Sequence, residues 1–232
     1  MEAVIFDLDG VLTSTDRLHF ESWKVVLEGF GIEVADSNKD RLLGLTRRRS
    51  LDILLGERSV TNEILEEMLK RKNERYLDLI ETLSPHDLAP GISILLQELN
   101  LARIRIGVAS ASQNVLPVLR NLGIDGFIQA ISDGIKVRRP KPEPDAFLFT
   151  ARALKVDPQF CLTIEDSAAG IQAARSAGMV VIGLGPSERV RGAHLVLDNL
   201  HNIHLKDLQE IFLRCLNHEP IPITISQLPQ AA

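Results

Sequence analysis

Short apolar runs alternate with segments of helical length along most of this chain. Five runs are short, apolar and bounded by turn residues, which is typical of buried strands. They cover residues 4–6, 104–109, 127–132, 161–164 and 179–184. Segments of helical length separate the later runs, at residues 92–100, 115–122, 145–154 and 168–177. Strands that alternate with helices predict an α/β fold with a doubly wound parallel sheet covered on both faces.

Residues 16–83 have a different pattern, which is rich in charge and contains no strand-like run. Apolar residues recur there at helical spacing, as from Trp23 to Phe30. We therefore predict an all-helical insertion directly after the first strand. The predicted division is an α/β core domain at 1–15 and 84–216, a helical cap domain at 16–83, and a loosely held C-terminal tail at 217–232. Ligands of such sheets bind beyond the carboxyl ends of the strands, so we expect the insertion to act as a lid.

Composition narrows the class of protein. The 232 residues are 45% hydrophobic and 25% charged, which excludes collagen-like, coiled-coil and broadly disordered chains. The formal net charge of −5 argues against a nucleic-acid partner. The two cysteines, Cys161 and Cys215, are too few for a disulfide framework, and no apolar run reaches the roughly 18 residues of a membrane span. We expect a cytoplasmic monomer without a membrane partner.

Two carboxylates, Asp7 and Asp9, follow the first predicted strand. Alternate residues of an extended chain point the same way, so both side chains can face one pocket. Like charges at close range raise each other's pKa, and a divalent cation is a common way to hold such carboxylates ionised. An ordinary turn, with both aspartates capping loop amides before Gly10, explains the same residues.

A second acidic pair, Glu165 and Asp166, follows the run at 161–164. Mg²⁺ in proteins takes one or two carboxylates together with waters and a substrate phosphate. Two acidic strand ends therefore favour a magnesium site. An N-cap role for Asp166 or Ser167 at the start of the next helix remains an alternative.

Two further strand ends carry a hydroxyl and a lysine. Ser110 follows the run at 104–109 among small residues, where the free amides of a helix start favour an oxyanion. A plain N-cap serine is the alternative. Lys141 lies between Pro140 and Pro142, which stiffen its backbone, although a lone lysine is most often exposed.

The four strand ends occur in the order D-x-D, Ser, Lys, E-D, and they resemble the four motifs of the haloacid dehalogenase (HAD) superfamily of phosphotransferases. The matching stretches read DLDGV, ASAS, KPEPD and IEDSAAGI. The finer pattern, from residue 3 to about 185, resembles the β-phosphoglucomutase family within it. The resemblance implies a Rossmann-like, HAD-like core with an inserted helical cap. It also implies an isomerase that interconverts β-D-glucose 1-phosphate and glucose 6-phosphate through an aspartyl-phosphate enzyme and β-glucose 1,6-bisphosphate.

The resemblance implies roles for the residues at the strand ends. Asp7 matches the nucleophile, and Asp9 matches the general acid and base. Ser110 and Lys141 match groups that hold the transferred phosphoryl group. The cofactor implied is Mg²⁺, held by Asp7, the backbone carbonyl of Asp9, and Asp166, with Glu165 at or beside the metal.

The resemblance also implies residues that bind the sugar phosphate. Arg47 is the candidate for the second phosphate because its planar fork binds phosphate through two hydrogen bonds, although an arginine run is usually a solvated face. Ser112 and Asn114 match groups that assist from the core, and Thr15 and Asp16 match a hinge. The other matching positions are His19, Trp23, Gly44, Ser50 and Lys72. Without the family, the spacing of His19 and Trp23 favours plain helix packing.

Two departures from the family pattern leave other functions open. Gln113 stands where the family often has a lysine, and Arg138 and Arg139 precede Lys141 where a small residue is usual. Either arginine is a candidate replacement for that charge, while a solvated loop is the alternative. A sugar-phosphate or phosphoglycolate phosphatase is therefore the second hypothesis. A protein that only binds a phosphorylated ligand is the third, although two adjacent carboxylates argue against it.

Overall fold

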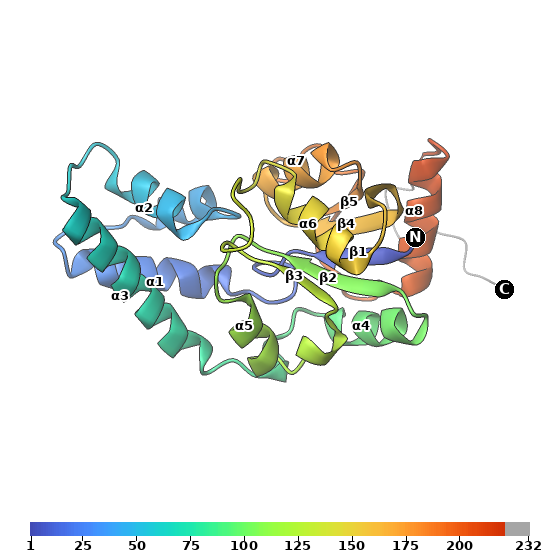
Figure 1. The fold of residues 1–232 in the computed structure, drawn as a ribbon, viewed down its shortest axis with the longest axis horizontal. Helices are drawn as coiled ribbons and strands as arrows, with labels where there is room; N and C mark the ends of the chain where they lie inside the picture. Colours follow the sequence, from blue (N-terminus) through green and yellow to red (C-terminus); the bar gives the residue numbers. More distant parts are fainter. Residues whose placement is uncertain (221–232) are drawn as a thin grey trace.

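A computed structural model describes residues 1–220 and contains a six-stranded sheet with helices on both faces (Figure 1). The strands are β1 (Ala3–Phe6), β2 (Arg105–Ala109), β3 (Ala130–Ser132), β4 (Cys161–Glu165), β5 (Val180–Leu184) and β6 (Leu195–Leu197). Their order is β3-β2-β1-β4-β5-β6, and every neighbouring pair is parallel. The predicted doubly wound α/β sheet is confirmed.

Alternating side chains of the central strand explain why both faces are covered. Val4 and Phe6 pack into one hydrophobic cluster, whereas Ala3 and Ile5 pack into another on the opposite face. The first cluster includes side chains from three helices, α4 (Ile92–Leu101), α5 (Val115–Asn121) and α8 (Leu205–Leu216). The second includes side chains from α6 (Asp145–Leu154) and α7 (Ala168–Ser176). All four residues of β1 are completely buried, so it forms the centre of the core.

Residues 16–83, which follow β1, form three α-helices on one side of the sheet (Figure 1). They are α1 (Asp16–Glu28), α2 (Arg47–Leu55) and α3 (Asn62–Ile80). Their apolar faces make a separate cluster that includes Trp23, Leu51 and Met68. The C-terminal end of α3 instead packs into a cluster of the sheet, through Tyr76 and Ile80. The helical segment therefore has its own core and is joined firmly to the sheet at one end.

The structure differs from the predicted elements at three places. The strand predicted at 127–132 is wrong over its first half, because Asp125–Phe127 forms a 3₁₀ turn and β3 begins at Ala130. Strand β6 and helix α8 were not predicted. Of the predicted tail at 217–232, residues 221–232 lie outside the described part of the chain. Within residues 1–220, no helix has both the length and the apolar character needed to cross a membrane.

Candidate active site

Three of the predicted site residues lie at the ends of three neighbouring strands. Strand β1 lies between β2 and β4, with Phe6 in register with Val108 and Ile164. Since all three strands are parallel, their carboxyl ends lie at one edge of the sheet. Asp7 follows β1 there and Ser110 follows β2, while β4 ends at Glu165.

Lys141 joins two of these strand ends. It is buried, and its Nζ donates to Asp7 Oδ1 at 2.6 Å and to Glu165 Oε1. Burial by itself lowers the pKa of Lys141, but Asp7 and Glu165 outweigh it and raise the pKa above its usual value. The exposed position expected for a lone lysine is therefore wrong, because two buried carboxylates neutralise the ammonium.

Glu165 is held on both of its oxygens. Besides Lys141 on Oε1, its Oε2 accepts from the backbone amide of Ser167 at 2.8 Å and from the Ser167 hydroxyl at 2.9 Å. Ser167 is the N-cap of α7 and accepts from the Gly170 amide at 3.1 Å. A Cβ added at Gly170 would overlap the Glu165 carboxylate. Ser167, and not Asp166, therefore caps this helix, which leaves Asp166 available for the site.

Asp166 lies against the backbone after Asp9. A Cβ added at Gly10, which has a φ of +85°, would overlap the Asp166 carboxylate. Arg189 donates from Nε to the Asp166 backbone carbonyl at 2.8 Å. Burial, followed by the charge of Glu165, raises the pKa of Asp166 to about 8.

The carboxylates fit an oxygen-ligated cation. Burial, and then the charges of Glu165 and Asp9, raise the pKa of Asp7 well above its usual value despite the contact with Lys141. Residues 1–220 contain no group of three His, Cys, Asp or Glu side chains that could hold a metal ion by themselves. Two crowded carboxylates, Asp7 and Asp166, with backbone, water and phosphate oxygens in the other positions, are the kind of ligand set that Mg²⁺ takes in proteins.

Asp9 has a different environment from Asp7. Its Oδ1 accepts from Thr15 Oγ1 at 2.5 Å and lies 3.5 Å from His19 Nε2. Burial by itself raises the pKa of Asp9, but His19, the Thr15 hydroxyl and the charge of Lys72 outweigh it and lower the pKa below its usual value. The pKa values of two carboxylates two residues apart are thus shifted in opposite directions, Asp7 upward and Asp9 downward. Such a difference is typical of two carboxyl groups that play different parts in proton transfer.

His19 connects Asp9 to a buried lysine. Lys72 Nζ lies 2.5 Å from His19 Nδ1, and the Tyr76 ring stacks on the imidazole with centroids 3.9 Å apart. Burial, and then the charge of Arg47, lower the pKa of Lys72 to about 7. Burial, and then the charge of Lys72, lower the pKa of His19. The sequence pattern does not mark Tyr76, although it falls one helical turn after Lys72 on the same face.

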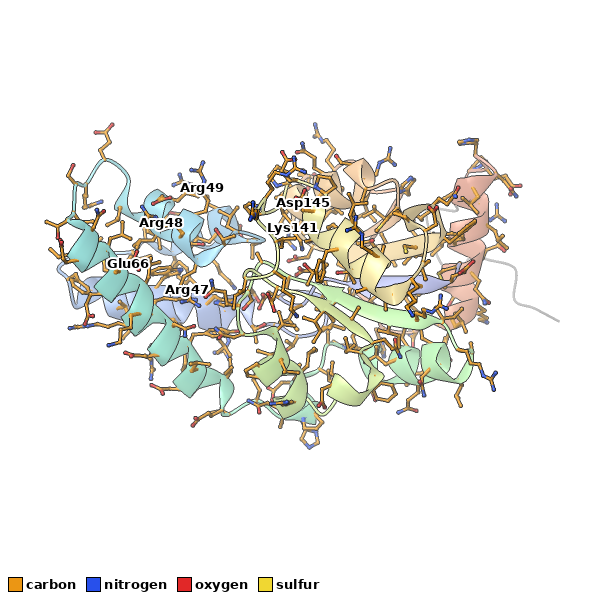
Figure 2. The ribbon with its side chains drawn as sticks, in the orientation of Figure 1. Arg47, Arg48, Arg49, Glu66, Lys141 and Asp145 are labelled. Carbon is orange, nitrogen blue, oxygen red and sulfur yellow. The ribbon has the colours of Figure 1, made fainter. Side chains whose placement is uncertain are left out.

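A cavity of about 330 Å³ lies between the helical segment and the sheet edge. Most of the predicted site residues line it: Asp7, Asp9, Asp16, His19, Trp23, Gly44, Arg47, Ser50, Lys72, Ser110, Ser112, Asn114 and Lys141. Thr15, Glu165 and Asp166 do not line the cavity, but Thr15 and Glu165 hold residues that do. Figure 2 shows the three arginines at the start of α2 on one side of the junction and Lys141 on the other.

Arg47 crosses from the helical segment to the core. Its Nη2 donates to Asn73 Oδ1 at 2.7 Å and to Gln113 Oε1 at 2.8 Å. Asn114 of the core also donates to Asn73 Oδ1, at 2.9 Å. The expected solvated face holds for Arg48 and Arg49, which are exposed, but not for the half-buried Arg47. No role was predicted for Asn73 from the sequence. Its hydrogen-bond partners, Arg47 and Asn114, lie 26 and 41 residues away along the chain.

The serines after β2 shape the loop that faces the cavity. Ser110 Oγ accepts from the Ser112 amide at 3.0 Å, and Ser112 Oγ accepts from the Asn114 amide at 3.2 Å. The N-cap of α5 is Asn114, so the alternative of Ser110 as a helix cap is wrong. Across the junction, a Cβ at Gly44 would meet the Ser167 hydroxyl. Gly44 thus brings the helical segment directly onto the N-terminus of α7.

Comparisons with known proteins bear on the family of this chain. The model of the family described as haloacid dehalogenase-like hydrolase matches residues 4–184. A β-phosphoglucomutase of Bacillus subtilis (strain 168) is 41% identical over 226 residues, which cover 96% of this chain and 100% of that protein. A phosphorylated carbohydrates phosphatase of Thermotoga maritima is 33% identical over 77% of this chain and 82% of its own length.

A solved structure of a related protein has the same fold as this chain. The crystal structure of a β-phosphoglucomutase from Clostridium difficile superposes with a TM-score of 0.90 at 37% identity, covering 94% of this chain and 99% of that one. The residues matched by the family model, 4–184, include those that line the cavity and end the strands at the sheet edge. The chain belongs to the haloacid dehalogenase-like hydrolase family.

Proposed function

We propose that this protein is a β-phosphoglucomutase, which interconverts β-D-glucose 1-phosphate and glucose 6-phosphate through β-glucose 1,6-bisphosphate. One observation supports the proposal most: a single cavity has the Asp7 and Asp9 pair on its core wall and Arg47 on its helical wall. A substrate with phosphate at two distant positions suits such a cavity. The proposal includes a monomeric, cytoplasmic enzyme whose partners are sugar phosphates.

Asp7 is the proposed nucleophile. Its carboxylate oxygen forms a bond to phosphorus while the bond from phosphorus to the leaving oxygen breaks, which produces an aspartyl phosphate. Lys141, at 2.6 Å from Asp7, remains charged and neutralises the phosphoryl oxygens, and Ser110 donates a hydrogen bond to them. Glu165 keeps Lys141 in place for this role.

Asp9 is the proposed general acid and base. Its lowered pKa means that it starts the cycle ionised at neutral pH, ready to take the proton of a sugar hydroxyl that attacks the aspartyl phosphate. The same carboxyl then returns the proton to the sugar oxygen when phosphate is transferred back to Asp7. Thr15 and His19 orient the carboxyl through their contacts with Oδ1.

Mg²⁺ is the proposed cofactor. Asp7, the backbone carbonyl of Asp9, and Asp166 would hold the ion, with Glu165 beside them. When bound, Mg²⁺ supplies positive charge to the phosphoryl oxygens. The remaining charge stabilisation comes from Lys141 of this chain.

Residues 16–83 are proposed to act as a cap domain over a core of residues 1–15 and 84–216, with Thr15 and Asp16 at the hinge. Closure excludes water, so that the aspartyl phosphate reacts with a sugar hydroxyl and is not hydrolysed. Arg47 binds the second phosphate, assisted by Ser112 and Asn114. The other proposed sugar-binding positions are His19, Trp23, Gly44, Ser50 and Lys72.

One assay tests the proposal. The protein receives β-glucose 1-phosphate, Mg²⁺ and a trace of glucose 1,6-bisphosphate, and glucose 6-phosphate and free phosphate are followed in parallel, with the α anomer as control. We expect rapid glucose 6-phosphate from the β anomer with little free phosphate. Stoichiometric free phosphate without glucose 6-phosphate would overturn the proposal.

A phosphatase is the second candidate. In it, water replaces the sugar hydroxyl in the attack on the aspartyl phosphate. It is favoured by the neutral Gln113 beside Arg47 and by the 33% identity to the Thermotoga maritima phosphatase. The free phosphate measured in the same assay distinguishes the two candidates.

A further inference from the structure

Several cations around the cavity are already neutralised. Lys39 Nζ pairs with Asp16 Oδ2 at 3.3 Å, and Arg48 Nε pairs with Asp52 Oδ1 at 3.1 Å. Such partners reduce the attraction that these cations exert on an anionic ligand.

Two arginines that line the cavity have no carboxylate partner within residues 1–220: Arg47 and Arg138. Among residues 1–220, the Arg47 side chain donates hydrogen bonds only to the amide oxygens of Asn73 and Gln113. Arg138 forms no hydrogen bond or ion pair with any described residue, and it is exposed on the core side. These two arginines approach the cavity from different walls, one from α2 and one from the loop between β3 and α6.

The neighbours of Arg138 in its loop differ from it. Arg139 pairs with Asp145 Oδ2 at 2.9 Å and with Glu143 Oε2 at 3.5 Å, and Lys136 pairs with Asp133 Oδ2 at 3.3 Å. Arg139 does not line the cavity. Of the three cations in this loop, Lys136, Arg138 and Arg139, only Arg138 has no carboxylate partner among residues 1–220 and lines the cavity.

The backbone places this loop beside the contact of Arg47. The Gly134 amide donates to the Ser112 carbonyl at 3.0 Å, and a Cβ added at Gly134 would lie 3.4 Å from Gln113 Cγ. Gln113 is the residue that accepts from Arg47. The loop that carries Arg138 therefore packs on the residue to which the cap arginine is bound.

We propose that Arg138 binds the phosphate that is not being transferred, together with Arg47 from the opposite wall. Arg138 is then a specificity-determining residue for substrates that carry a phosphate far from Asp7. A phosphate dianion between two guanidinium groups forms charge-assisted hydrogen bonds to both, and the exposed Arg138 is free to turn toward it. The inference rests on the proposed function, because it presupposes such a substrate.

Calorimetry tests the inference without turnover. Beryllium trifluoride with Mg²⁺ occupies the transfer position on Asp7, and glucose 6-phosphate is then titrated into the full chain. We expect Arg138→Gln to weaken glucose 6-phosphate binding about tenfold, because one charge-assisted contact is lost. Arg138→Lys keeps the charge and should retain most of the affinity. Arg139→Gln is the matched control, and its affinity should stay within about twofold because Arg139 is paired with carboxylates.

A second arm measures the hydrolysis of acetyl phosphate, which carries no distant phosphate. Arg138→Gln should weaken glucose 6-phosphate binding by a larger factor than it lowers this rate. The inference is overturned if Arg138→Gln binds glucose 6-phosphate as well as the wild type does, if Arg139→Gln loses as much, or if the wild type does not bind it. A selective loss in Arg138→Gln without any mutase activity would instead overturn the proposed function and leave the second phosphate site standing.

Discussion

Replacing Lys72 with methionine tests how much the charge of this buried lysine costs. Lys72 is 2% exposed, contacts His19, and lies 5.5 Å from the Trp23 ring centroid and 4.8 Å from that of Tyr76. Burial, and then the charge of Arg47, lower its pKa from 10.5 to about 7. Methionine has a similar length and no charge, so Lys72→Met should unfold less readily than the wild type at neutral pH while binding substrate more weakly.

The magnitude follows from the pKa. A difference of about 3.5 pKa units between 10.5 and 7 corresponds to about 5 kcal/mol at 1.36 kcal/mol per unit. Below pH 7, Lys72 is charged in both states and the folded state bears the whole cost. Above pH 7 the unfolded state keeps a proton on Lys72 that the folded state has lost, so the contribution of Lys72 to wild-type stability rises with pH. Between pH 7 and pH 9 the rise is about 2 kcal/mol, because Lys72 is already half deprotonated at pH 7, and the methionine variant lacks this rise.

Urea unfolding at pH 7 and pH 9 measures the stability difference between the wild type and Lys72→Met. The unfolding is monitored by the fluorescence of Trp23, the one tryptophan of the chain. The stability advantage of Lys72→Met should shrink by about 2 kcal/mol between the two pH values. The pKa values of His19 and Asp9 are both lowered, so these groups titrate below this window. Lys70→Met on the same helix is the control, because the Lys70 side chain is 69% exposed. An advantage that stays constant from pH 7 to pH 9 would refute the argument.

Three other predictions concern the proposed catalytic centre. Asp7→Asn should lower kcat by at least about 10³-fold while calorimetry still detects sugar-phosphate binding; retained turnover would exclude Asp7 as the nucleophile. Gly170→Ala should destabilise the protein by about 1–3 kcal/mol in urea unfolding because its Cβ overlaps Glu165, whereas Gly126→Ala, with no atom within 4 Å of the new Cβ, should not. Chelation of Mg²⁺ should abolish turnover reversibly, and at 100 times its Kd Mg²⁺ should add about 2.7 kcal/mol to stability, seen as a higher Tm; an unchanged Tm would argue against the metal site.

The core elements were predictable where periodicity and turn residues agree over a sufficient length. The helix at Asp145–Leu154 has the predicted bounds, and each of the strands β1, β2, β4 and β5 differs from the prediction by one residue at one of its ends. Strand β6 has only three residues and lies at the edge of the sheet, where it pairs with β5 alone. A run this short carries too little pattern for a prediction.

Among the site residues, those next to strand ends were predictable, and those brought together from distant segments were predictable only through family resemblance. Asp7 and Asp9 stand beside an obvious strand. By contrast, the sequence pattern does not indicate that Lys141 is buried, because its partner Asp7 lies 134 residues away. Nor does it distinguish Arg47 from the two arginines that follow it, since the difference comes from Asn73 and from Gln113 of the core.

The sequence by itself determined the α/β class, the helical segment after the first strand, and acidic groups at two strand ends, because these depend on interactions within about ten residues of chain. The tertiary structure decided which charges are buried, which are paired and which face the cavity. Asp7 and Asp9 are two residues apart, yet the pKa of Asp7 is raised and that of Asp9 is lowered. The physical reason is that desolvation and charge partners depend on distances in space, and those partners come from segments far apart in the sequence.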